Sequence, residues 1–327
     1  MGITLAKENI REEIEMRVAY TDALIEIAEK NRDIVVLDCD LMRAIGTVRF
    51  QQRFPDQTVN CGIQEANMYS VAAGMSLIGK IPFAHSFGAF STRRACDQIY
   101  ESCCYPRLNV KAVGSDPGIS AQINGGTHMA FEDMGIMRSF PAMTVVEPTD
   151  STVMKAMIKL AAKTYGNFYL RLDRRNAIKI YEDGSVFEIG KAISIKDGRD
   201  ITLIAMGLCV GEIIKAAKIL EAKGISARVI DMITIKPLDE KAVVSAARDT
   251  GAIVTAENHC IATGLGAAVS SVAAQTCPVP VEMIGISDMF GEVGQPSFLK
   301  EKYGLTAEKI AEAAEKAISR KCVSIQG

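Results

Sequence analysis

The chain has 327 residues, of which 48% are hydrophobic and 23% are charged, and its formal net charge is −2 at pH 7. This balance leaves no electrostatic footprint for binding nucleic acid or an anionic membrane. We therefore expect a small-molecule partner, with no nucleic acid and no membrane. The length exceeds that of a usual single domain and predicts two compact units, each with its own core.

Nine cysteines are scattered along the chain and never form the C-x-x-C spacing of a zinc site. We expect them to be reduced core residues. The N-terminal segment is charged and lacks the apolar stretch of a signal peptide, and no run of 18 apolar residues occurs. These features predict a cytoplasmic protein.

Apolar periodicity in the first part of the chain predicts helices alternating with short strands. The predicted elements, in chain order, are a helix at 18–30, strands at 33–40 and 58–63, a helix starting near 65, a strand at 81–87, a helix at 92–104, and strands at 109–114, 143–146 and 168–172. Short apolar strands separated by helices predict a mostly parallel sheet that is covered on both faces.

Residues 176–200 contain Asp-Gly twice and show no helical period, which marks a domain boundary. We predict a first domain over residues 1–185 and a second over 186–327. Beyond the boundary the alternation restarts, with strands at 201–205, 227–232 and 252–256 and helices at 210–223 and 241–248. The predicted fold class is α/β, with two doubly wound domains and mostly parallel sheets.

Two strand ends carry side chains suited to binding a ligand, which in open α/β sheets lies where strands end and helices begin. Glu65 stands at a strand-to-helix junction, where a partly buried carboxylate could share a proton with a ligand nitrogen. The alternative is a first-turn glutamate that favours the helix macrodipole. Phe87 and Phe90 follow a strand and could present a flat face to a planar ring, or they could be core residues.

The segment over residues 114–128 is long and glycine-rich for an α/β connection, which indicates a functional loop over a site. It contains His128, a candidate for contacting substrate, whereas His85 and His259 are weaker candidates.

Two arginines lie at or near the end of the predicted strand at 168–172. Arg171 and Arg174 suit phosphate binding, with surface pairing to Asp173 as the alternative. The segment Thr263-Gly-Leu-Gly lacks the third glycine and the chain position of a dinucleotide-binding loop, so we assign it no such role.

Taken together, these segments resemble the C-terminal half of the transketolase family over residues 17–318. The matching motifs include Gly62-Ile-Gln-Glu65, Ser86-Phe-Gly-Ala-Phe90, Gly125-Gly-Thr-His128, Glu147-Pro-Thr-Asp150 and Asn176-Ala-Ile178. The order and spacing of the motifs, rather than any one of them, make the resemblance specific.

The resemblance implies a thiamine-diphosphate enzyme that transfers a two-carbon ketol unit from a ketose, expected to be phosphorylated, to an aldose. Glu65 would hydrogen-bond the cofactor's aminopyrimidine ring and activate the cofactor, which acts as the electron sink. The implied site consists of Glu65 and His128 in catalysis, Asp40, Phe87, Phe90 and Arg93 at the cofactor, and Arg17, Asp116, Asn124, His128 and Arg174 at the substrate.

The sequence departs from the family in having no Gly-Asp-Gly motif, which normally holds the diphosphate through Mg²⁺, and a complete transketolase is about twice as long. These departures imply a split enzyme. A separate N-terminal subunit would carry the diphosphate and Mg²⁺ site, and this chain would be inactive alone. We expect a heterotetramer, with a self-dimer as a further option.

Two further departures lie in the substrate loop, where Asn124 replaces a family aspartate and Asp116 stands where many members have a histidine. They put the usual pentose phosphate substrates in doubt. The rival interpretations are the beta subunit of a 2-oxo acid dehydrogenase, a deoxyxylulose-phosphate-synthase-like half, and a non-catalytic ligand-binding α/β module.

Overall fold

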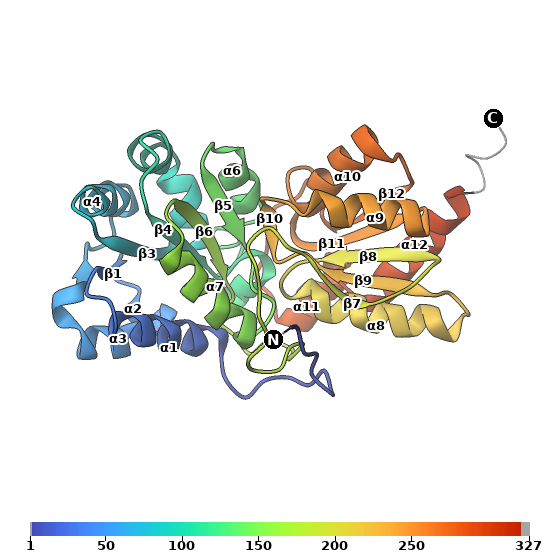
Figure 1. The fold of residues 1–327 in the computed structure, drawn as a ribbon, viewed down its shortest axis with the longest axis horizontal. Helices are drawn as coiled ribbons and strands as arrows, with labels where there is room; N and C mark the ends of the chain where they lie inside the picture. The colour runs from blue at the N-terminus through green and yellow to red at the C-terminus, as the bar shows by residue number, and fades with distance from the viewer. Residues whose placement is uncertain (1, 322–327) are drawn as a thin grey trace.

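The computed structural model describes residues 2–321 as two α/β units side by side (Figure 1). The first unit is built on a seven-stranded sheet with the order β10-β5-β6-β4-β3-β1-β2. Its strands are β1 (Ile34–Asp38), β2 (Thr58–Asn60), β3 (Ile81–Phe87), β4 (Lys111–Ser115), β5 (Met143–Val146), β6 (Asn167–Leu172) and β10 (Thr234–Lys236). Neighbouring strands are parallel except β10, which runs antiparallel to β5.

Helices cover both faces of this sheet. They are α1 (Met16–Ala28), α2 (Met42–Ile45), α3 (Val48–Arg53), α4 (Glu65–Leu77), α5 (Cys96–Gln98), α6 (Asp133–Ser139) and α7 (Ser151–Lys163). Successive strand residues point to opposite faces. In β1, Ile34 and Val36 join the core formed with α1 and α7, whereas Val35 and Leu37 join the core formed with α4. This two-sided burial explains the continuous apolar runs in the sequence.

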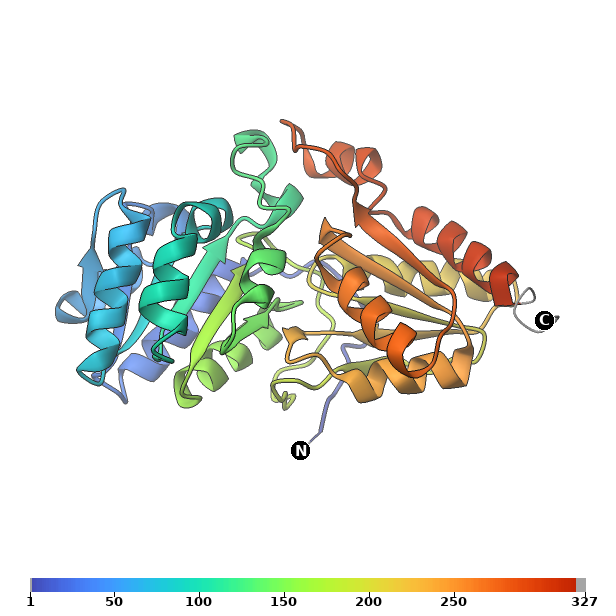
Figure 2. The ribbon, with the colours of Figure 1, turned by 90° about the horizontal axis from the view of Figure 1, so that it is seen from above.

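The second unit has a five-stranded sheet with the order β12-β11-β8-β9-β7. Its strands are β7 (Ile193–Lys196), β8 (Ile201–Ala205), β9 (Ala227–Asp231), β11 (Ile253–Cys260) and β12 (Val281–Ile286), and its helices are α8 (Cys209–Ala222), α9 (Glu240–Thr250), α10 (Leu265–Thr276), α11 (Pro296–Lys302) and α12 (Ala307–Lys321). Only β7 is antiparallel within it. Helices α8 and α12 pack together, as do α9 and α10 (Figure 2).

The predicted fold class is confirmed, since both units carry mostly parallel sheets flanked by helices. The predicted strands agree with the structure to within a few residues, but the helix predicted at 92–104 is wrong as a single helix. There the chain forms wide helical turns at η2 (Phe90–Arg94) and η3 (Ile99–Cys104) on either side of α5. Wide turns hold more residues than the 3.6-residue period on which the prediction rested.

The two units are joined by more than the covalent linker. Strand β10 follows the boundary predicted at residue 185 and yet pairs with β5 of the first sheet. The N-terminal arm also pairs with the linker, through bridges between Leu5 and Tyr181 and between Arg11 and Ile178. Segments on either side of residue 185 thus pair with each other. The domain boundary at that residue stays a prediction.

The cysteines are free thiols in the part of the chain that the structure describes. Four of them are buried, namely Cys39, Cys103, Cys104 and Cys209, and four are partly exposed, namely Cys61, Cys96, Cys260 and Cys277. Cys322 lies outside the described residues. Within residues 2–321, no helix is long and apolar enough to cross a membrane.

Candidate functional site

The candidate site lies at the carboxyl edge of the first sheet. Phe87, Ser115 and Leu172 are register partners at the ends of β3, β4 and β6. Residues that follow these strands therefore emerge at one edge, where loops of a parallel sheet converge. This register brings Asp116 and Arg174 beside the aromatic residues after β3.

Glu65 is the first residue of α4 and is buried, with 1% of its surface exposed. The Ser86 hydroxyl donates a hydrogen bond to Glu65 Oε1 at 2.8 Å, and Arg94 Nη1 lies 2.7 Å from Oε2. The predicted strand-to-helix junction is confirmed. Glu65 also lies in the first turn of α4, where a carboxylate interacts favourably with the helix macrodipole. It therefore fits both interpretations, as a carboxylate at a helix start and as a buried carboxylate at a strand end.

Phe87, Phe90 and His128 form a cluster of three rings next to Glu65's partner Arg94. The ring centroids lie 6.1 Å apart for Phe87 and Phe90, 5.6 Å for Phe87 and His128, and 5.1 Å for Phe90 and His128. The Arg94 guanidinium lies over the Phe90 ring, 4.1 Å from its centroid. The loop predicted to be functional thus places His128 against both phenylalanines, which are not simply core side chains.

Arg17, Asp116 and Arg174 form a second group, here called the arginine corner. Arg174 Nε lies 2.7 Å from Asp116 Oδ1, and both arginines donate to the carbonyl of Ala44, at 2.9 Å from Arg17 and 3.2 Å from Arg174. Burial raises the pKa of Asp116 to about 6, although the charge of Arg174 lowers it. The Arg174 guanidinium lies 5.4 Å from the centroid of Phe87, which connects the corner to the ring cluster.

The remaining predicted site residues are Asp40, Arg93 and Asn124, and of these Arg93 contacts the residue next to His128. Asp40 is exposed after β1 and has a positive φ of 63°, and its backbone N–H donates to Asn60. Arg93 pairs with Glu132 at 3.1 Å and donates to the carbonyl of Thr127, so it braces the residue before His128. Asn124 is exposed at the end of the short helical segment η4 (Gly118–Asn124) in the same loop.

The prediction that Arg171 captures phosphate is wrong. Arg171 is buried, with 1% of its surface exposed, and its guanidinium pairs with Asp133 at 2.8 Å and with Glu147 at 3.0 Å. A guanidinium enclosed by two carboxylates has no free face for a ligand. The alternative pairing of these arginines with Asp173 is also wrong, because Asp173 accepts hydrogen bonds from the Ser120 hydroxyl and from the backbone N–H of Arg175.

The other two histidines are buried, with 0% of their surface exposed. His85 is buried beside Tyr20, and burial lowers its pKa to about 3. Burial likewise lowers the pKa of His259 to about 4, and its Nε2 accepts from the backbone of Gly135. Both imidazoles are therefore neutral at pH 7, in line with their weaker standing as candidates.

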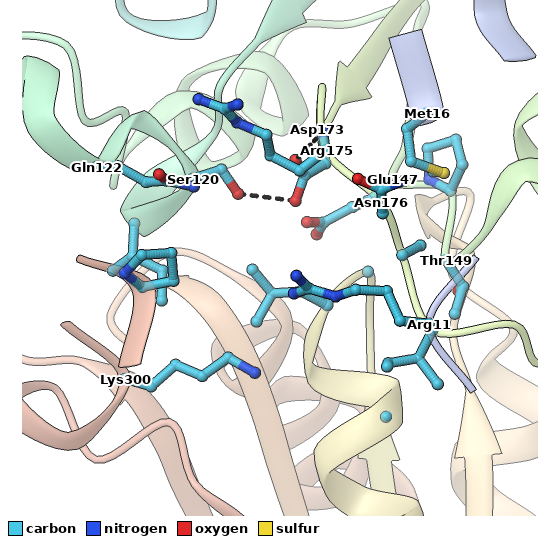
Figure 3. A pocket seen from close by; sticks show the side chains of 18 residues that line it. Arg11, Met16, Ser120, Gln122, Glu147, Thr149, Asp173, Arg175, Asn176 and Lys300 are labelled. Carbon is cyan, nitrogen blue, oxygen red and sulfur yellow. Dashed lines mark hydrogen bonds between the residues drawn. The ribbon is translucent and has the colours of Figure 1, made fainter. Parts of the chain in front are cut away.

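Two features escaped prediction from the sequence. Arg94 contacts Glu65 directly. The sequence Arg93-Arg94 does not indicate which of the two arginines lies against Glu65. A cavity of about 110 Å³ also lies between the two units, and Arg11, Arg175 and Lys300 are among its lining residues (Figure 3). Its lining does not include Glu65 or the ring cluster, so it is separate from the candidate site.

Family models match both units of the chain. The transketolase pyrimidine-binding domain matches residues 12–179, and the transketolase C-terminal domain matches residues 190–310. The chain belongs to the transketolase family. This assignment agrees with the two mostly parallel sheets of the structure.

Individual relatives define the type of subunit. The chain is 48% identical over 310 residues to the 6-deoxy-6-sulfo-D-fructose transketolase subunit SqwH of Clostridium sp. (strain MSTE9), covering 95% of this chain and 96% of the relative. It is 35% identical to one subunit of the apulose-4-phosphate transketolase of Phocaeicola vulgatus, covering 92% and 96%. A solved structure described as a split gene transketolase, inactive beta4 tetramer, superposes with a TM-score of 0.88 at 43% identity, covering 94% and 99%. The chain is thus a C-terminal subunit of a split transketolase.

Proposed function

We propose that this subunit provides the pyrimidine-binding half of a thiamine diphosphate site. The observation that carries the proposal is the buried carboxylate of Glu65 beside the rings of Phe87, Phe90 and His128. These residues fit an aminopyrimidine, because a planar heterocycle with hydrogen-bond donors suits aromatic faces next to a carboxylate acceptor. When bound, thiamine diphosphate supplies a nucleophilic carbon and an electron sink.

In this proposal the Glu65 carboxyl group would share a proton with the pyrimidine ring nitrogen and so favour the protonation state needed for activation. Phe87 and Phe90 exclude water from the ring and fix its plane. His128 lies at the mouth of the ring cluster, with Nδ1 within 3.0 Å of the Thr127 hydroxyl, and hydrogen-bonds the reacting end of the sugar. Asp40 and Arg93 are assigned to the cofactor pocket in the same proposal.

The proposed reaction is transfer of a two-carbon ketol unit from a ketose to an aldose. The arginine corner receives the far end of the sugar, because Arg17 and Arg174 converge on the same carbonyl beside the ring cluster. Two relatives are named for ketoses with an anionic group, a sulfonate in one and a phosphate in the other. We therefore propose a ketose with an anionic terminal group.

A separate subunit completes the site in this proposal. The sequence contains no Gly-Asp-Gly segment, so the diphosphate and Mg²⁺ are assigned to an N-terminal subunit. The similar solved chain is described as an inactive tetramer of beta chains. By analogy, we propose that this chain assembles with itself when alone and becomes active in a hetero-oligomer, with the cofactor across the interface.

The test is to purify the chain with the protein encoded beside it that carries Gly-Asp-Gly, add thiamine diphosphate and Mg²⁺, and measure ketol transfer. Glu65→Ala in the same complex should lower kcat by about 100-fold or more, the usual cost of losing an acid–base group. Asp22→Asn, which alters an exposed carboxylate on α1, is the control. Full activity in Glu65→Ala would rule out the proposed role of Glu65 in activating the cofactor. Release of carbon dioxide from pyruvate by the wild-type complex would instead support the 2-oxo acid dehydrogenase or synthase alternatives.

A further inference from the structure

The positive charges of the arginine corner are already balanced inside the chain. Arg174 Nε lies 2.7 Å from Asp116 Oδ1 and 2.6 Å from Oδ2. Arg17 Nε lies 2.6 Å from Glu15 Oε2. Two guanidinium groups and two carboxylates therefore sum to zero, so the corner presents hydrogen-bond donors without a net positive charge.

Asp116 is fixed in this position. Its surface is 0% exposed, and its backbone N–H donates to the carbonyl of Leu172 at 3.0 Å. Its φ of 53° lies in the left-handed region, which Asp and Asn tolerate better than other non-glycine residues. The carboxylate cannot turn into solvent when a ligand arrives, and any anion at Arg174 lies near it.

Arg174 can still bind a ligand despite this pairing. Its Nε faces Asp116 and Nη1 donates to Ala44, whereas the guanidinium has five N–H groups in all. The side chain keeps 13% of its surface exposed, so part of the fork is open. The remaining N–H groups of Arg174 can still donate hydrogen bonds, but the charge of the guanidinium is neutralised by Asp116. They therefore suit a ligand group that has several oxygens and little or no negative charge.

We propose that Asp116 is a specificity-determining residue that restricts the far end of the sugar to at most one negative charge. A sulfonate monoanion fits the corner, whereas a phosphate dianion does not. Like charges a few ångströms apart repel strongly at the effective dielectric of a protein, and a dianion experiences this repulsion twice. This inference rests on the proposed ketol transfer and names the substrate class for it.

The experiment uses the reconstituted complex of both subunits and three ketoses that differ only at carbon 6, as hydroxyl, sulfonate or phosphate. It is run at pH 8, where the phosphate ester is a dianion and Asp116 is ionised. We expect kcat/KM to be higher for the sulfonate than for the phosphate by about tenfold or more, as one net charge at this distance predicts.

Asp116→Asn keeps the backbone conformation and removes the charge. It should therefore raise the ratio of kcat/KM for the phosphate to kcat/KM for the uncharged ketose about tenfold, through the KM of the phosphate. Glu15→Gln should act in the same direction more weakly, because Glu15 is more exposed. Asp22→Asn removes an arginine-paired aspartate elsewhere on the same unit and should alter no preference.

The outcomes separate the two proposals. If the wild-type complex transfers no ketol unit from any of the three sugars, the proposed function fails. If it transfers the unit but prefers the phosphate, and neither Asp116→Asn nor Glu15→Gln shifts that preference, the charge inference alone is overturned. If Asp116→Asn folds poorly, two measurements still test the charge inference. They are the wild-type preference between sulfonate and phosphate, and the change in that preference in Glu15→Gln.

Discussion

Arg94 contacts two groups that would bind the pyrimidine in the proposed site, namely the Glu65 carboxylate and the Phe90 ring. Its guanidinium pairs with Glu65 at 2.7 Å and covers the face of Phe90 at 4.1 Å. Nearly half of the Arg94 side chain is exposed, so the pair can open at small cost. Binding of the cofactor in the proposed position must displace this arginine.

Replacing Arg94 therefore gives a direct expectation. Arg94→Gln should tighten binding of thiamine diphosphate to the two-subunit complex by roughly three- to tenfold, since breaking a partly exposed pair costs about 1 kcal/mol. Isothermal titration calorimetry measures this affinity. Arg53→Gln, which breaks an exposed pair with Glu29, is the matched control. Weaker binding in Arg94→Gln would instead mean that Arg94 supports the cofactor.

At the same scale, the structure brings Phe87, Phe90 and His128 together beside the Glu65–Arg94 pair, and their roles stay predictions. The prediction for Arg171 is wrong. The motif shows an arginine near a strand end, but its two carboxylate partners lie 38 and 24 residues away in the chain. Only the folded sheet brings them around Arg171. Arg174, three residues later, lies beyond the strand, where the predicted ligand contact is still possible.

The loop over the site is held by an element of the other unit. Asn258 of β11 accepts from the N–H of Ile119 and donates to the carbonyl of Pro117, each at 2.9 Å. Gly118 between them has a φ of 53°, and an added Cβ would lie 2.2 Å from Asn258 Oδ1. The loop therefore requires both this glycine and this asparagine.

Asn258→Ala should loosen the loop, because it leaves the buried N–H of Ile119 without a partner and removes one of the two hydrogen bonds that the carbonyl of Pro117 accepts. We expect the free energy of unfolding to fall by about 1–3 kcal/mol and KM for the sugar to rise severalfold, with kcat less affected. Urea unfolding and steady-state kinetics measure the two effects. Asn9→Ala removes an exposed asparagine contact and serves as the control. An unchanged KM would mean that Asn258 serves stability alone.

The elements themselves were largely predictable, because buried parallel strands leave continuous apolar runs and short polar connections. The failures have physical causes. Wide turns replaced the regular helix at 92–104, and the three-residue β10 is too short to leave a pattern. Its pairing with β5 depends on tertiary contact, which no local periodicity records.

The two units of the molecule share a buried polar junction. The carboxylate of Asp231 in β9 accepts hydrogen bonds from Thr149 at 2.6 Å and from Tyr181 at 2.8 Å. Thr149 belongs to the first unit and Tyr181 to the linker. Burial raises the pKa of Asp231 to about 7, although these two hydrogen bonds lower it.

This shift predicts a pH dependence of stability. A carboxyl with a folded pKa above its unfolded value of about 3.9 stabilises the fold fully at low pH, and that stabilisation is lost as pH rises through 7. When the pH is raised from 5 to 8, the free energy of unfolding should therefore fall less in Asp231→Asn than in wild type. The difference between the two decreases should be roughly 2–3 kcal/mol. Urea unfolding at each pH measures the difference. Asp249→Asn, an exposed change in the same unit, should follow wild type, and an Asp231→Asn curve parallel to wild type would contradict the expectation.

Strand β10 gives the whole molecule a further property. Its antiparallel pairing with β5 covers the outer edge of the first sheet. Without it, the backbone groups along β5 would form an open edge of the kind that recruits strands from other chains. The second unit thus protects the first against edge-to-edge association. A fragment cut at residue 185 would tend to aggregate rather than behave as a smaller, independent pyrimidine-binding module.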